Sequence, residues 1–110
     1  MNWNFSFYNE ALAKEVMNLP RHSLAKVYTI LCRLKDYGMS AQRMPHMRHL
    51  RNGLWEVRAI AADGSIRIFY CWVSTSNFVL LHMFKKKSQE TPKHELEKAL
   101  KRMKEVQNGQ

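Results

Sequence analysis

Three segments near the middle of the chain decide the fold of this protein: LWEVRAIA (residues 54–61), SIRIFYCWV (residues 65–73) and NFVLLHMF (residues 77–84). Asp63-Gly64 separates the first two segments and is a strong hairpin signal, while the polar residues 74–76 separate the second and third. Segments of this length, rich in β-branched and aromatic residues, are typical of strands. We therefore predict three consecutive antiparallel strands.

Alternation along these strands assigns their side chains to two faces. Trp55 and Val57 oppose Glu56 and Arg58. On the second strand Ile66, Ile68, Tyr70 and Trp72 oppose Arg67, Phe69 and Cys71, and on the third Val79, Leu81 and Met83 oppose Leu80, His82, Phe84 and Lys86. If Arg58, Arg67 and Lys86 share one face, three cations converge on one patch.

The flanking segments are mostly helical. Apolar residues recur at helical spacing over residues 9–19 until Pro20, and again over residues 23–37, with Ser23 as the expected N-cap and Gly38 as the end. Thr91-Pro92 predicts the start of a third helix that runs to about Val106. Residues 2–8 have strand periodicity and would form an edge strand, whereas residues 39–53 show no sustained period and read as a long surface loop.

This order predicts an α+β domain: a small antiparallel sheet with two N-terminal helices on one face and a C-terminal helix. The helices leave the other face of the sheet partly open. With 110 residues, the chain suffices for one core, so residues 1–110 form a single domain. No run of residues is apolar enough to span a membrane, and Cys32 and Cys71 are far apart in the sequence. We expect a cytoplasmic protein with reduced thiols.

The charge indicates a polyanionic partner. The chain has 18 Lys and Arg against 9 Asp and Glu, a net charge of +9, and residues 37–87 alone carry eight cations and two acids. Counterion release attracts so basic a domain to nucleic acid, although solubility alone also tolerates this balance. No helix pair has the tight turn of a DNA-recognition motif, so RNA is the favoured partner.

Four segments together resemble one family. They are MPHMRHLRNGLWEVR (residues 44–58), IRIFY (residues 66–70), LLHMFKKKSQETP (residues 80–92) and ELEKALKRMKE (residues 95–105), and they resemble the phage-derived, HigB-type branch of the RelE toxin superfamily. The resemblance covers nearly the whole chain. It implies the toxin of a type II toxin–antitoxin system, an endoribonuclease that cleaves mRNA on the translating ribosome. It also implies a cytoplasmic protein that a helix-turn-helix antitoxin neutralises, monomeric when free and able to form a heterotetramer with the antitoxin.

Such cleavage is metal-independent and uses no cofactor: a base takes the 2′-hydroxyl proton, cations stabilise the phosphorane, and an acid protonates the 5′-oxygen. By the same resemblance, Arg58 would hold the scissile phosphate, Arg67 would be a second phosphate ligand and Lys86 a catalytic cation after the last strand. The alternative for Arg58 is a simple ion pair with Glu56. RelE proper has a catalytic tyrosine near the start of the last helix, where this chain has none.

His82 and Tyr70 are the replacement candidates. We expect Tyr70 in the core, since it opposes Arg67 by alternation, while His82 is either a catalytic group or a hydrogen-bonded core histidine. The choice of base and acid stays open at this point. The expected RNA contacts, in the loop and beside Lys86, are Arg43, His46, Arg48, His49, Arg51, Lys85 and Lys87.

Two further possibilities concern metal and aromatic residues. His46 and His49 have no nearby Cys or carboxylate in the sequence, so we expect no metal site. The strand aromatics Trp55, Phe69, Trp72, Phe78 and Phe84 are expected in the core rather than stacked on bases. The alternative to a nuclease is a non-catalytic RNA-binding or regulatory module on the same fold, which binds RNA with a steep salt dependence and leaves it intact.

Overall fold

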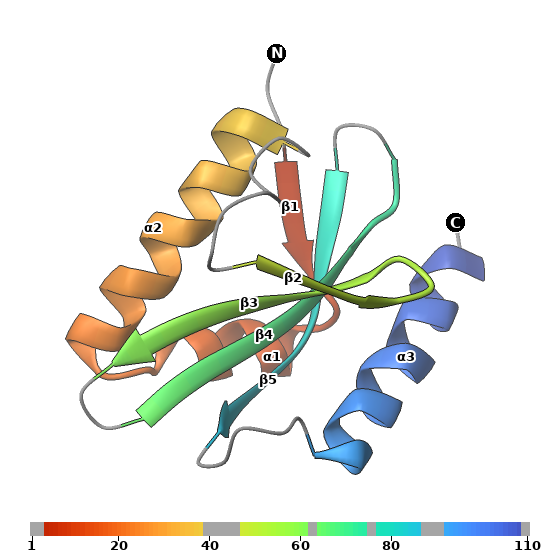
Figure 1. Cartoon of the computed structure of the whole chain (residues 1–110). Coiled ribbons are helices and arrows are strands. Elements are labelled where there is room, and N and C mark those ends of the chain that lie inside the picture. The colour runs from red at the N-terminus through yellow and green to blue at the C-terminus, as the bar shows by residue number, and fades with distance from the viewer. Residues whose placement is uncertain (1–3, 39–46, 62–63, 75–76, 87–91, 109–110) are drawn as a thin grey trace.

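The computed structural model describes residues 4–38, 47–61, 64–74, 77–86 and 92–108. Its elements follow in the order β1 (Asn4–Phe7), α1 (Glu10–Met17), α2 (Arg21–Tyr37), β2 (Met47–Arg51), β3 (Leu54–Ala61), β4 (Gly64–Trp72), β5 (Asn77–Lys86) and α3 (Lys93–Asn108). They form one five-stranded sheet with helices on both faces (Figure 1). The predicted α+β class is confirmed.

The sheet has the strand order β1-β5-β4-β3-β2. β2 to β5 pair antiparallel, whereas β1 pairs parallel to β5, with Phe5 beside Phe78. The three predicted central strands and the N-terminal edge strand are confirmed. Because β3, β4 and β5 are adjacent strands in the sheet, side chains of the three strands that point to the same face lie next to one another.

β2 corrects the described part of the loop predicted over residues 39–53, while residues 39–46 of that loop lie outside the described residues. Met47 to Arg51 pair with β3, and Asn52 and Gly53 join the two strands with positive φ angles of 54° and 88°. A two-residue turn of this kind favours Asn-Gly, which is itself a hairpin signal. The strand has no apolar period because only Met47 is buried, and the sequence pattern therefore misses it.

The starts of α1 and α2 are set by the residues that precede them. Asn9 caps α1, since its side chain accepts a 2.8 Å hydrogen bond from the Leu12 amide. α2 starts after Pro20 and not at Ser23, whose side chain is fully buried one turn inside the helix. The predicted Ser23 cap is wrong because Ser23 faces the core. The predicted Thr91 cap lies outside the described residues.

The sheet separates two apolar cores. α1 and α2 pack on the face that carries Val57, Ile68 and Tyr70, together with Leu12, Val27, Leu34 and Phe78. α3 packs on the opposite face against Phe69 and Leu81, and contributes Ala99 and Met103. Burial of large side chains such as these contributes roughly 1.5–3 kcal/mol each, so α3 is held by its apolar face.

A bulge in β5 changes which side chains of that strand point to each face of the sheet. Phe69 of β4 lies opposite His82, but the next residue, Tyr70, lies opposite Leu80, so Leu81 is the extra residue. Leu80 therefore joins the core under α1 and α2, and Leu81 joins the core under α3. The predicted grouping of Val79 and Leu81 with Met83 is wrong for this reason, since Met83 lies on the other face.

Candidate nucleic-acid interface

Polar residues of the three central strands meet on the sheet face that carries α3. Arg58 of β3 lies directly opposite Arg67 of β4, and Lys86 of β5 lies opposite Ser65 of β4. Glu56 is two residues before Arg58 and shares its face. The predicted convergence of three cations is therefore present, with a carboxylate among them.

Glu56 binds Arg67, not Arg58. Arg67 Nη1 lies 3.1 Å from Glu56 Oε1, and Arg67 Nε donates to the Ser65 hydroxyl at 2.9 Å. Glu56 is 0% exposed and Arg67 7% exposed. Charge-assisted hydrogen bonds in such surroundings hold a guanidinium in one orientation. The simple Arg58–Glu56 pair considered from the sequence is not what the described residues show.

Arg58 keeps its guanidinium available. The side chain is half-buried, and its Nε is buried without a hydrogen-bond partner among the described residues. A buried donor without a partner is costly, by about 1–3 kcal/mol, and native sites that contain one often bind a ligand there. A phosphate oxygen would satisfy this donor.

Lys86 lies within the same group of charges and is 4% exposed. Burial lowers the pKa of its amine, the Arg67 guanidinium lowers it further, and Arg48 and Arg58 act in the same direction, whereas Glu56 opposes them. An ammonium in such a place gives up its proton more readily than an ordinary surface lysine.

Arg48 adds a fourth cation from the edge of the sheet. It lies on β2 directly opposite Glu56, and its side chain is exposed. We call Arg48, Arg58, Arg67 and Lys86, with Glu56 among them, the cationic cluster. Four cations around one carboxylate leave positive charge in excess, which attracts a polyanion. The cluster reaches solvent through Arg48 and Arg58 and is buried at Arg67 and Lys86.

Other expected RNA contacts lie elsewhere. His49 pairs with Trp55 across β2 and β3, with the ring centroids 4.9 Å apart, and Trp55 packs on the core under α1 and α2. Lys85 lies opposite Ile66 of that same core, so it points away from Lys86. Arg51 is exposed near the β2–β3 turn. Arg43, His46 and Lys87 lie outside the described residues.

His82 connects the sheet to α3. Its Nε2 lies 2.8 Å from Glu95 Oε1, the residue is 7% exposed, and its ring lies nearly parallel to those of Phe69 and Phe84, with centroids 6.4 and 6.1 Å away. These contacts are those of a hydrogen-bonded core histidine, one of the two alternatives that the sequence leaves open. Glu95 thus engages Nε2, one of the two ring nitrogens of His82.

The aromatic residues are mostly core residues, as expected. Tyr70 is fully buried, its hydroxyl donates to the Met47 sulfur at 3.9 Å, and burial strongly raises the pKa of its phenol. Phe69, Phe78 and Phe84 are also buried, which leaves Trp55 and Trp72 half-buried at the sheet ends.

Sequence reasoning underrates two members of this site. It offers Glu56 only as a partner for Arg58, although alternation places Glu56 on the face of Arg67 as well. It does not single out Ser65, whose register opposite Lys86 follows only from the pairing of β4 with β5.

Within the described residues, no group of three or more His, Cys, Asp or Glu side chains is placed to hold a metal ion. None of the helices in these residues has the length and apolarity needed to cross a membrane.

Comparison with known families assigns the chain to one of them. The family model for phage-derived Gp49-like proteins (DUF891) matches residues 14–104, which include every member of the cationic cluster. The chain belongs to the Gp49-like family. Gp49-like proteins are part of the RelE/ParE toxin-like superfamily, so the chain is a toxin-like protein of that superfamily. No curated protein matches this Gp49-like chain.

Proposed function

We propose that this Gp49-like protein is the toxin of a HigB-type toxin–antitoxin pair and cleaves mRNA. The observation that carries this proposal is the cationic cluster, in which cations from four adjacent strands surround one carboxylate on one sheet face. RNA cleavage without a metal needs such an excess of fixed positive charge, because the transition state carries more negative charge than the phosphodiester.

In the proposed reaction the RNA 2′-hydroxyl attacks the neighbouring phosphorus and loses its proton to solvent water, and the bond to the 5′-oxygen breaks, leaving a 2′,3′-cyclic phosphate and a protonated 5′-hydroxyl. Arg58, whose Nε has no partner among the described residues, would bind a phosphate oxygen. Arg67, held by Glu56 and Ser65, would stabilise the extra charge without reorienting. This fixed orientation favours the transition state over the free substrate.

Lys86 is proposed as the acid that protonates the leaving 5′-oxygen. A general acid works best when its pKa is close to the working pH, and burial with three neighbouring arginines lowers the pKa of Lys86 in that direction. The arginines stay protonated and cannot exchange a proton. His82 is assigned no proton transfer here, because Glu95 holds its ring nitrogen.

The substrate and partners are proposed from the same family. Family members of HigB type cut mRNA that is being translated, and a helix-turn-helix antitoxin silences them. The net charge of +9 fits a ribosome-bound role, since ribosomal RNA presents a dense phosphate surface. We extend both the ribosome and the antitoxin to this chain as part of the proposal.

The test maps the 5′ ends of a defined mRNA incubated with purified protein, in a translating extract and without ribosomes. We expect discrete cuts only during translation, and their loss with Arg58→Ala, Arg67→Ala or Lys86→Met. Arg21→Ala, an exposed cation at the start of α2, is the matched control and should cut normally. Circular dichroism of every variant separates loss of the site from loss of the fold.

Two results would overturn the proposal. Intact mRNA in both arms, with RNA binding that weakens steeply with salt, indicates the non-catalytic RNA-binding module instead. Cuts that persist in all three variants place the reaction outside the cationic cluster.

A further inference from the structure

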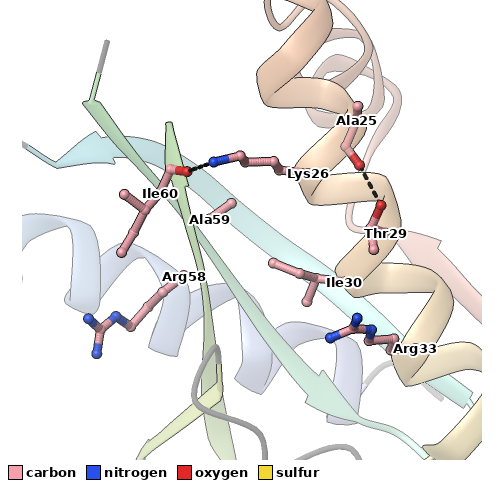
Figure 2. A pocket seen from close by; sticks show the side chains of 8 residues that line it. All are labelled: Ala25, Lys26, Thr29, Ile30, Arg33, Arg58, Ala59 and Ile60. Carbon is pink, nitrogen blue, oxygen red and sulfur yellow. Dashed lines mark hydrogen bonds between the residues drawn. The ribbon is translucent and has the colours of Figure 1, made fainter. Parts of the chain in front are cut away.

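A groove separates α2 from the outer edge of β3, away from the buried part of the cationic cluster (Figure 2). It has a volume of about 650 Å³. α2 contributes Lys26, Ile30 and Arg33, and β3 contributes Arg58, Ala59 and Ile60. The volume suits several residues of extended polypeptide rather than a single side chain.

The β3 wall of this groove is a strand edge that pairs with no other strand of the described residues. β2 pairs with β3 only from Leu54 to Val57, so no strand in the described part of the chain covers Arg58 to Ile60 on that side. The Ile60 carbonyl faces the groove, because it accepts a 2.6 Å hydrogen bond from Lys26 Nζ. Since the N–H and C=O of one residue share an edge and every second residue repeats it, the Arg58 backbone groups face the same way.

Edges of this kind accept another strand, and proteins often protect them with a lysine. Here Lys26 satisfies one carbonyl through a single hydrogen bond from a flexible, exposed side chain. A strand that pairs with β3 would replace that bond with backbone hydrogen bonds and release the Lys26 ammonium. Ile60, 63% exposed beside the edge, offers apolar surface to the added strand.

The charges of the groove select an acidic ligand. Lys26, Arg33 and Arg58 line it, and its described lining contains no Asp or Glu. Arg33 and Lys26 project from the helix, whereas Figure 2 shows the Arg58 guanidinium on the other side of β3. Cations therefore stand on both sides of the strand edge.

We propose that this groove binds an acidic, extended segment of a partner protein, which adds to β3 as an edge strand. Main-chain hydrogen bonds to Arg58 and Ile60 would supply affinity, and carboxylates on both sides would supply specificity. Neighbouring residues of an extended segment point to opposite sides. One carboxylate would meet Lys26 and Arg33 and another would meet Arg58, so the two acids must be an odd number of residues apart.

RNA is the less fitting occupant. A single-stranded nucleic acid would use stacking surfaces as well as cations, and the described lining contains no aromatic side chain. A nucleic acid also lacks the regularly alternating N–H and C=O groups by which a peptide strand pairs along a strand edge. Docking of the peptide does not depend on RNA cleavage, so it stands or falls separately from the proposed function.

The test uses the full chain labelled with ¹⁵N and a capped, Thr- and Val-rich octapeptide with two adjacent central glutamates. We expect saturable amide shifts at Arg58–Ile60 and along Lys26–Arg33, and at least tenfold weaker binding with the double variant Lys26→Ala/Arg33→Ala. Lys35→Ala, which removes an exposed cation of the same helix outside the groove, is the matched control and should bind normally.

Three further ligands make the result decisive. The same peptide N-methylated at alternate amides should lose binding, and so should an isomer whose glutamates are two residues apart. Equal binding of either peptide overturns the strand-addition proposal, as does the absence of shifts in the groove with the parent peptide at millimolar concentration. An eight-nucleotide single-stranded RNA that shifts the same amides more strongly than the peptide would assign the groove to RNA and would also overturn it.

Discussion

Glu56 and Arg67 form a 3.1 Å ion pair between β3 and β4, and the carboxylate has no exposure to solvent. Arg58 lies directly opposite Arg67, and Lys86 lies opposite Ser65, which also binds Arg67. Glu56 therefore acts on two neighbours: it orients the Arg67 guanidinium and it opposes the lowering of the Lys86 pKa.

Glu56→Ala should destabilise the protein by about 3–5 kcal/mol, because it leaves the Arg67 charge buried without its partner. Glu56→Gln should cost less, since the amide oxygen still accepts from Arg67. Urea unfolding measures both. Glu10→Ala removes the exposed Lys14–Glu10 pair and should change the free energy of unfolding by less than about 1 kcal/mol. If Glu56→Ala changed the free energy of unfolding as little as Glu10→Ala does, the prediction would be contradicted.

Lys86→Met should abolish RNA cleavage and raise stability by about 1 kcal/mol at pH 7, because it removes a buried cation that faces three arginines. The sign follows from the pKa of Lys86, which is lower in the folded than in the unfolded protein. The charged amine therefore opposes folding in full below its folded pKa, and this cost shrinks as the pH rises from the folded to the unfolded pKa.

The stability gain of Lys86→Met should accordingly shrink between pH 7 and about pH 10, as the wild-type lysine loses its proton. Chemical denaturation at both pH values gives the comparison. Lys98→Met, on the exposed side of α3, is the control and should stay within about 0.5 kcal/mol of the wild type. A loss of stability in Lys86→Met would show that its amine is well paired.

The His82–Glu95 contact should anchor the first turns of α3 to β5. A double-mutant cycle with His82→Phe and Glu95→Gln is expected to give a coupling free energy of about 1–2 kcal/mol. Amide hydrogen exchange over α3 should accelerate in either single variant. The exposed Lys93–Glu97 pair, at 3.9 Å, should give less than about 0.5 kcal/mol in the same cycle. If the two cycles gave equal coupling free energies, the His82–Glu95 contact would not anchor α3.

Cys71 should resist alkylation in the folded protein. It is fully buried in the core under α3, and burial raises the pKa of its thiol to about 11, so the reactive thiolate is scarce at about pH 8. Mass spectrometry after iodoacetamide treatment should find Cys32, which is partly exposed, modified first. Both thiols should react at similar rates in urea. Rapid native labelling of Cys71 would mean that α3 opens readily.

Much of the fold follows from local pattern. The alternation of Leu54 to Trp72, interrupted at Asp63-Gly64, predicts β3 and β4 within one residue, because a half-buried strand needs a period of two. The pattern fails where packing overrides it. Met47 to Arg51 form a strand with one buried residue, and the bulge in β5 places Leu81 on the face of Phe69 and Leu80 on the opposite face.

The candidate site is partly predictable for the same reason. Alternation allows Arg58, Arg67 and Lys86 to share one face, and the strand registers place them there together with Arg48 and Glu56. It does not bring Lys85 or His49, whose register directs them to the other face. The catalytic roles of all these residues stay predictions.

The sequence by itself determined the class of the fold, the basic charge and the faces of β3 and β4, since these depend on composition and on neighbours along the chain. Only the tertiary structure decided that Glu56 pairs with Arg67, that Glu95 holds His82 and that Ile60 of β3 faces α2, where its carbonyl accepts from Lys26. Each of these depends on strand register and helix placement, which are set by contacts between residues distant in sequence.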